Sequence, residues 1–489
     1  MNIELLISHP TLAVRLDPRN RLVLSILLIA TFVVFLNETI LGVALPQIMK
    51  QLSIEASTGQ WLTTAYMLTM AIVIPITGFL LQRFTTRQMF ITAMLLFCIG
   101  TLFGAVAPDF TVLLVGRVVQ AASTAIMLPL IMTSVMELVP EAIRGKIMGT
   151  ISIVMSVAPA IGPAVSGLVL SVLDWRWLFW LILPLALTVL IVGMLKMSNV
   201  GEQKRIPVDV LSVVLSAFAF AGVIYGLSEF AQAARGDATV SPFVFLGVGA
   251  VALAAFIWRQ LYLARAKQPL LDFRVFRSRI YTFSVLIMAL AMLTLFGLGI
   301  LTPIYAQNAL GVTALTTGLL LLPGGLLMGL SGPLVGRLYD RVGPRVLIVP
   351  GSIAASAAMW FMTTFGEDTS IYSILVANVV LSVGLAFLFT PLFTISMSSV
   401  PPQFYSHSSA IIGTVQQLAG AAGTALFITI MTTVQVSETA TGSSDVSALT
   451  DGIHWAFVAG AIASTFMVVL APLIGRVANT AEMDAELAP

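Results

Sequence analysis

Apolar stretches of 20 or more residues recur along almost the whole chain, and this feature restricts its possible folds more than any other. A helix needs about 20 apolar residues to cross roughly 30 Å of hydrocarbon, whereas barrel strands would alternate over about ten residues. Only 9% of the residues are charged, against roughly 25% in soluble domains. We therefore expect an all-α polytopic membrane protein with 14 transmembrane helices. The expected spans are residues 23–46, 58–81, 88–107, 111–136, 146–170, 175–195, 209–231, 241–264, 280–308, 314–336, 345–365, 370–396, 407–434 and 453–475.

The positive charges of the loops predict the orientation of these spans. With the N-terminus in the cytoplasm, 20 of the 24 Lys and Arg residues lie on the cytoplasmic side, three lie on the far side, and Arg117 lies inside a span. Such an asymmetry is the positive-inside rule. We expect a multi-pass protein of the cytoplasmic (inner) cell membrane with both termini in the cytoplasm.

A loop pattern occurs twice and divides the chain into two related parts. The same interval of five residues separates Gly78 from Arg83 after the second span and Gly336 from Arg341 after the tenth. Paired repeats around a central cavity are typical of transporters. The expected parts are a cytoplasmic N-terminal segment (1–22), a six-helix half (23–195), an inserted transmembrane hairpin (196–270), a second six-helix half (271–475) and a cytoplasmic tail (476–489).

Three segments resemble motifs of the major facilitator superfamily. Residues 336–345 resemble its loop signature, and residues 113–122 resemble its R-x-x-Q-G motif, with Ala121 where glycine is usual. Residues 158–167 resemble the antiporter motif of proton-driven exporters. The motif residues of this last segment are Pro159, Gly162, Pro163, Ser166 and Gly167.

The number of spans narrows the resemblance to the 14-span drug:proton antiporter branch, which includes multidrug, quaternary-ammonium and lincosamide exporters. Two segments depart from this pattern. The first loop motif has Gln82 where Asp is usual and Thr85 where Gly is usual, and the first span has Asn37 where Asp is usual, with the acid one place later at Glu38. A shift of one residue turns a helical side chain by about 100°.

The resemblance implies a proton-coupled exporter of lipophilic, cationic or neutral drugs that works by alternating access. Its partners would be a small drug-like substrate, protons and the lipid bilayer. It implies no cofactor, with the proton gradient as the source of energy, and no enzyme activity. We expect a monomer that binds no nucleic acid. The three histidines and one cysteine are widely spaced, so the sequence predicts no metal site.

Glu38 and Arg117 are the two charged residues that we expect to carry proton coupling. By helical rise, Glu38 lies about 12 Å and Arg117 roughly 9 Å from the far ends of their spans. Ionisable groups at such depths are rare and mark functional sites. We predict that Arg117 interacts with Glu38 directly, through Gln120 or through water. The alternatives are a structural carboxylate and an arginine that only ties its helix to backbone carbonyls.

Other residues are candidates for the substrate pocket and for the cytoplasmic gate. The pocket candidates are polar or aromatic residues within spans, namely Asn37, Trp61, Tyr66, Gln120, Tyr305, Gln307, Asn308, Gln416 and Gln417. Trp61 is alternatively an interfacial anchor. The gate candidates are Gly78, Arg83, Gly336, Asp340, Arg341 and Gly343. The small residues of the antiporter motif predict close helix packing.

Two other functions remain open at this point. The chain could export a physiological metabolite, a siderophore or a lipid, with drug export incidental. It could also be a membrane sensor or scaffold that transports nothing.

Overall fold

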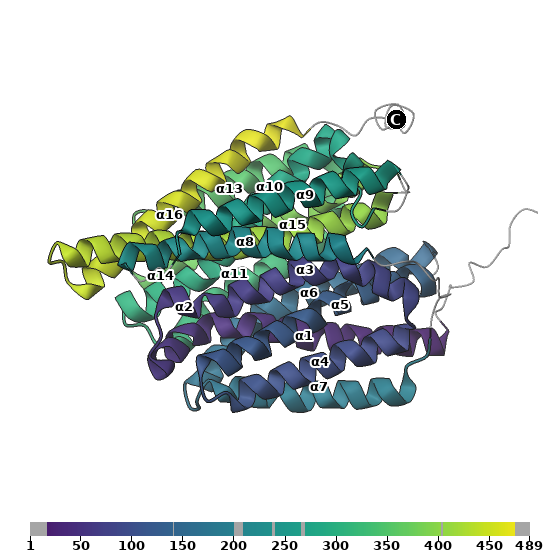
Figure 1. Ribbon diagram of the computed structural model, residues 1–489, viewed down its shortest axis with the longest axis horizontal. Helices are drawn as coiled ribbons and strands as arrows, with labels where there is room; N and C mark the ends of the chain where they lie inside the picture. The colour runs from purple at the N-terminus through teal and green to yellow at the C-terminus, as the bar shows by residue number, and fades with distance from the viewer. Residues whose placement is uncertain are drawn as a thin grey trace, which may run out of the picture.

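The computed structural model describes residues 17–139, 141–199, 209–236, 240–265, 269–401 and 404–474. The surroundings of some residues inside these ranges are not described, and Gly78, Pro159 and Asp340 are among them. Throughout the described ranges the chain forms helices joined by short loops, with no strand (Figure 1). The all-α membrane fold expected from the sequence is confirmed.

Thirteen of the described helices are long and apolar enough to cross a membrane. The remaining expected span, 146–170, falls on helix α6, whose described apolar stretch is Ile161–Leu170. The N-terminal group of helices comprises α1 (Pro18–Leu52), α2 (Ala56–Gly59), α3 (Trp61–Arg83), α4 (Thr86–Val106), α5 (Phe110–Leu138), α6 (Glu141–Leu170) and α7 (Arg176–Lys196). The hairpin comprises α8 (Val210–Arg235) and α9 (Pro242–Arg265).

The C-terminal group of helices follows a short connection that contains η1 (Phe273–Arg277). Its helices are α10 (Arg279–Ile304), η2 (Tyr305–Ala309), α11 (Ala314–Leu330), α12 (Gly332–Val342), α13 (Arg345–Met362), α14 (Ile371–Ser398), α15 (Tyr405–Ala440), α16 (Asp445–Leu470) and η4 (Ala471–Leu473). We call the end of the bundle where α1 begins the proximal end, and the end where α1 stops the distal end.

Several helices differ in extent from the expected spans, because hydropathy does not detect polar helix ends. Helix α15 continues six residues beyond the expected end at 434, to Ala440, and α16 begins at Asp445 rather than 453. The expected span 314–336 is interrupted at Ser331, and the amphipathic helix α12 follows. At the proximal end, a capping box between Thr85 and Gln88 starts α4.

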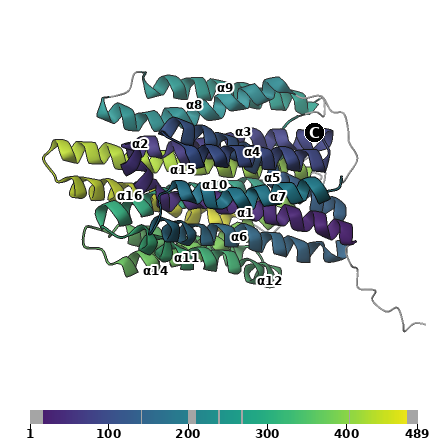
Figure 2. The same ribbon diagram turned by 90° about the horizontal axis from the view of Figure 1, so that it is seen from below.

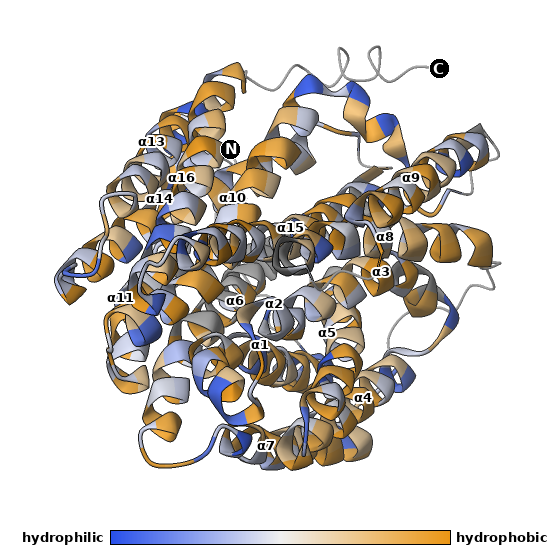
Figure 3. Ribbon diagram, turned by 60° about the vertical axis from the view of Figure 1, so that its left-hand side comes forward, coloured by the Kyte–Doolittle hydropathy of each residue, from blue (hydrophilic) through white to orange (hydrophobic). Residues whose placement is uncertain are grey.

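The helices pack side by side along a common direction (Figures 1 and 2). The N-terminal and C-terminal groups meet mainly where α6 packs on α11, α3 packs on α15, and α1 packs on α10. The hairpin lies at one edge of the bundle, where α8 contacts α15 and α3 (Figure 2). Hydrophobic residues dominate the helices (Figure 3), as expected for a protein that contacts lipid.

Candidate functional site

Arg117 lies in the middle of the N-terminal group, on α5, and is 1% exposed. Its Nε donates a hydrogen bond to the carbonyl oxygen of Leu62 (3.3 Å), and one terminal nitrogen donates to Gln120 Oε1 (3.0 Å). The guanidinium carbon also lies 4.0 Å from the centroid of the Tyr66 ring, a cation–π contact. The arginine is therefore satisfied by two oxygens and an aromatic face.

The residues around Arg117 are themselves held by hydrogen bonds from three helices. Gln120 Nε2 donates to Thr101 Oγ1 of α4 (2.9 Å), so both ends of the Gln120 amide are engaged. The Tyr66 hydroxyl of α3 lies 2.5 Å from Thr124 Oγ1 of α5. All four side chains are at most 1% exposed. This network fixes the direction in which the guanidinium points.

Glu38 and Asn37 lie on α1 and present unpaired polar atoms. Asn37 is 0% exposed, and neither of its amide atoms has a hydrogen-bond partner among the described residues. One carboxylate oxygen of Glu38, Oε2, is likewise buried and unpaired within the described residues. Such groups are rare in folded proteins and often mark a position for water, an ion or a ligand.

Glu38 and Arg117 form no ion pair in the described structure, where Arg117 contacts Leu62, Gln120 and Tyr66 instead. The helices that carry the two residues, α1 and α5, pack against each other, but the two charged groups do not touch. Direct contact between the two residues is therefore absent from this conformation. An interaction through water stays a prediction.

The described part of the antiporter motif lies where α6 packs against both α1 and α11. A Cβ atom added to Gly162 would overlap Thr39 Oγ1, next to Glu38 in sequence. A Cβ on Gly167 would lie 2.7 Å from the carbonyl oxygen of Ala314 on α11. The Ser166 hydroxyl is buried without a partner in the described structure. Pro163 also belongs to this contact, because a Cβ on Gly318 would overlap its carbonyl oxygen.

The end of α10 contributes three of the predicted pocket residues, which point in different directions. The chain forms a π-helical turn at Tyr305–Ala309, a geometry that is rare and frequent at functional sites. Gln307 Nε2 donates to the carbonyl oxygen of Val43 on α1 (3.1 Å), so it joins the two groups of helices. Tyr305 is 0% exposed and donates to the carbonyl oxygen of Gly366 (2.6 Å) within the C-terminal group. Asn308 is exposed.

The remaining pocket candidates are dispersed. The Trp61 ring lies 5.5 Å from the Tyr225 ring of α8, so it packs on the hairpin. Gln416 and Gln417 lie half-buried on α15, and Gln417 Oε1 has no partner within the described residues. The structure thus brings Tyr66 and Gln120 to Arg117, but not Trp61 or Tyr305.

The gate candidates lie at the proximal end, and the structure describes four of the six. Arg83 and Arg341 are exposed. Gly336 lies within α12, and a Cβ there would meet nothing within 4 Å. Gly343 ends α12 with φ of 79°, a conformation that favours glycine, and its N–H donates to the carbonyl oxygen of Tyr339. Gly78 and Asp340 fall outside the description, so the gate stays a prediction.

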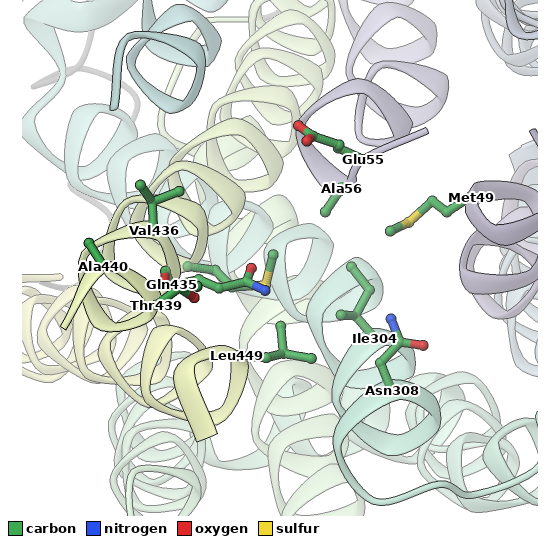
Figure 4. Close-up of a pocket in the computed structure, with 11 residues that line it drawn as sticks. Met49, Glu55, Ala56, Ile304, Asn308, Gln435, Val436, Thr439, Ala440 and Leu449 are labelled. Carbon is green, nitrogen blue, oxygen red and sulfur yellow. Dashed lines mark hydrogen bonds between the residues drawn. The ribbon is translucent and has the colours of Figure 1, made fainter. Parts of the chain in front are cut away.

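A pocket of about 500 Å³ lies at the distal end, between α1 and α2 on one side and α15 on the other (Figure 4). Its lining includes Met49, Glu55, Asn308, Met431 and Gln435. By helical rise along α1, it is about 16 Å from Glu38. It is therefore a separate space from the Glu38–Arg117 region.

Sequence reasoning missed Thr101, Thr124 and Thr39, which complete the surroundings of Arg117 and Glu38. Threonines in apolar helices usually bond to the backbone of their own helix, so the residue type alone did not mark these three as site residues. The spacing was informative for Thr124 alone, because positions 117, 120 and 124 lie on one face of a helix. Within the described residues, no group of His, Cys, Asp and Glu could hold a metal ion.

The family model described as "Major Facilitator Superfamily" matches residues 27–424. The chain is 41% identical over 445 residues to the lincomycin resistance protein LmrB of Listeria monocytogenes, covering 90% of this chain and 93% of that protein. It is 38% identical over 457 residues to LmrB of Bacillus subtilis, covering 92% and 95%. The puromycin resistance protein pur8 of Streptomyces alboniger is 29% identical over 463 residues, covering 94% and 91%.

A solved structure has a similar fold. It is that of a bacterial homologue of the human lysosomal transporter Spinster, in an inward-facing and unoccupied conformation. The TM-score is 0.67 at 15% identity, and the alignment covers 94% of this chain and 97% of that one. This likeness concerns the fold alone.

Proposed function

The chain belongs to the Major Facilitator Superfamily, and from this membership we propose that it is a proton-coupled exporter of lipophilic, cationic or neutral drugs. Membership makes it a multi-pass membrane transporter. Relatives named for resistance to lincomycin, to puromycin and to several drugs support export as the direction of transport.

The observation that carries the proposal is the position of Glu38 near the contact between helix groups. A Cβ on Gly42, one turn beyond Glu38 on α1, would lie 3.2 Å from the carbonyl oxygen of Gly299 on α10 of the other group, whereas Thr39 packs against Gly162 of α6 within the N-terminal group. Glu38 therefore lies about one turn from a contact between the two groups. A change in its charge alters the electrostatic energy where the two groups must separate, which links protonation to alternating access.

The proposed cycle follows from this placement and from the predicted orientation, with the proximal end in the cytoplasm. Glu38 takes a proton from the distal side and releases it to the cytoplasm, while the drug leaves in the opposite direction. Arg117 tunes the charge of Glu38 through space. Each net charge that moves inward gains about 2.3 kcal/mol per 100 mV of inside-negative potential.

The role proposed for α6 is to prevent leakage. Its small residues allow close contact with both α1 and α11, so that an empty site is closed from the distal side. The two groups of helices would then rock about this contact as two six-helix halves. Asp340 and Arg341 would hold the proximal gate shut in the opposite state.

Ethidium efflux from cells tests the proposal. Cells that express the wild type should lose preloaded ethidium faster than control cells, and an uncoupler should abolish the difference. Glu38→Gln should express at the same level and behave like the control cells. Efflux that is insensitive to the uncoupler would contradict proton coupling, and the absence of efflux for a panel of cationic dyes would contradict drug export.

A further inference from the structure

The distal pocket begins where the contact between the two groups of helices ends. Gln307 bonds to Val43 and closes the seam between α10 and α1. Its neighbour Asn308 already lines the pocket, together with Met49, which lies about one and two-thirds turns beyond Val43 on α1. The pocket therefore lies directly beyond the closed seam, on the distal side.

Both groups of helices contribute to the pocket, so its shape depends on their relative position. Met49, Glu55 and Ala56 come from the N-terminal group, whereas Asn308, Met431 and Gln435 come from the C-terminal group. Figure 4 shows Glu55 and Ala56 across the open space from Leu449, with Gln435 and Asn308 on opposite sides. A rocking motion of the groups would change the distance between these sides.

The π-helical turn at Tyr305–Ala309 supports a functional role for this place. Leu310 donates to the carbonyl oxygen of Tyr305 across five residues, so the turn holds one residue more than an α-helical turn. Within this turn, Gln307 bonds to Val43, and Asn308, next in sequence, lines the pocket. Turns of this kind are rare and occur frequently at functional sites.

The chemistry of the lining indicates its ligand. Among the described residues that line the pocket, Glu55 is the one that carries a charge, and no basic residue lines it. Asn308, Gln435 and Thr439 supply hydrogen-bonding groups, while Met49 and Met431 supply polarizable apolar surface that adapts to different shapes. A volume of about 500 Å³ is in the range of sites that hold drug-sized molecules.

We propose that the distal pocket is a second binding site, which takes an amphipathic organic cation on the distal side of the closed seam. The exported molecule would occupy it after leaving the central region and before diffusing away. That the ligand is an exported drug rests on the proposed function. The existence of a binding site for an organic cation rests only on the residues that line the pocket.

Propidium binding to the purified protein tests the site without requiring transport. Propidium is a permanently charged, membrane-impermeant aromatic cation, and its fluorescence reports binding in the absence of any gradient. Wild type should bind it saturably. Glu55→Gln should raise the dissociation constant about fivefold, the upper value for an exposed ion pair, and high salt should reduce this difference. Asn308→Lys should abolish saturable binding, because it places a positive charge in the pocket.

A matched control is Glu367→Gln, which neutralises an exposed acid at the same end of the bundle but outside the pocket. It should bind propidium like the wild type, and all variants should be monodisperse in size-exclusion chromatography. Saturable binding that is equal in the wild type, Glu55→Gln and Asn308→Lys would overturn the proposal, and so would a lack of saturable binding to the wild type.

Transport separates this proposal from the proposed function. In cells, external propidium should inhibit ethidium efflux by the wild type and inhibit Glu55→Gln less. If propidium binds with the expected dependence on Glu55 while no ethidium efflux occurs, the pocket stands and the proposed export is wrong. If ethidium efflux is normal but propidium binding is unchanged by the substitutions at Glu55 and Asn308, the proposed export is supported and the pocket proposal is wrong.

Discussion

The guanidinium of Arg117 lies 4.0 Å from the centre of the Tyr66 ring, and this contact takes the place that an acid would be expected to fill. The Tyr66 hydroxyl is held by Thr124 at 2.5 Å, so the ring cannot easily turn away. A desolvated cation–π contact contributes about 2 kcal/mol. We therefore expect Tyr66 to act as a positioning residue, which holds the guanidinium of Arg117 and keeps it from pairing with Glu38.

Replacing Tyr66 with Leu should release Arg117 toward Glu38. The freed guanidinium would stabilise the ionised carboxylate, so the pH profile of transport should move to lower pH, and the rate at neutral pH should fall about tenfold. Tyr66→Phe keeps the ring and loses only the hydroxyl, so its profile should resemble that of the wild type. Dye transport between pH 5.5 and 8.5 measures this. If Tyr66→Leu and Tyr66→Phe lower the transport rate equally and leave its pH profile unchanged, the role of Tyr66 is purely structural.

Gly162→Ala should disturb the contact between α6 and α1. The new methyl group would overlap the Thr39 side chain, and overpacking of this kind costs about 1–3 kcal/mol. We expect lower thermal stability and a proton leak that is independent of the drug, measured with a pH-sensitive dye in proteoliposomes. The second substitution Thr39→Ala should partly restore both properties.

Gly247→Ala is the control for this substitution, since a Cβ there would meet nothing within 4 Å. It should leave the stability and the leak unchanged. Normal coupling in Gly162→Ala would show that the close contact is not needed to prevent leakage.

Gln307→Leu should favour separation of the two groups at the distal end. The variant loses the hydrogen bond to Val43, with a net value of about 1 kcal/mol, which shifts a two-state population about fivefold. Spin labels at Ile54→Cys and Thr439→Cys, in a Cys98→Ala background, would report the separation. The long-distance population should grow in Gln307→Leu but not in Gln51→Leu, an exposed control. An unchanged distribution would exclude Gln307 as a latch.

Asp209→Asn should weaken the hairpin in a pH-dependent way. Burial opposes ionisation of Asp209, but hydrogen bonds from Arg259 and Ser212 outweigh it and hold the pKa of this carboxyl below its ordinary value. The stabilisation is thus present above about pH 4, the ordinary pKa of Asp, and is lost as the pH falls through the lowered pKa.

The variant should therefore melt about 2 °C below the wild type at pH 7, and the difference should vanish near pH 2. Asp368→Asn, in an exposed loop, serves as the control. A difference that stays constant from pH 7 to pH 2 would contradict the ion-pair account.

The fold was predictable from the sequence because each span must satisfy its own backbone within the membrane, so that length and hydropathy suffice. Hydropathy does not predict where a helix ends once it has left the membrane. The polar residues between Gln435 and Ala440 extend α15, and hydropathy does not register them. The break at Ser331 likewise depends on local backbone geometry.

The site was predictable only in part. Depth in the membrane singled out Glu38 and Arg117, and helical spacing placed Gln120 beside Arg117. Which other residues join the site depends on how the helices pack on one another, and a single sequence does not reveal this packing. Tyr66 and Tyr305 were equal candidates for the pocket, yet Tyr66 faces Arg117 and Tyr305 packs within the C-terminal group.

Transport by Glu38→Gln in proteoliposomes tests the central claim most directly. With wild type, an imposed pH gradient should drive ethidium accumulation in the vesicles. Adding ethidium to vesicles with such a gradient should also make the gradient collapse faster, because protons move in exchange for the dye. Glu38→Gln should show neither response, although it still binds ethidium, while Glu38→Asp should retain part of both. Gradient-driven accumulation by Glu38→Gln at the wild-type rate would contradict the assignment of Glu38 as the proton carrier.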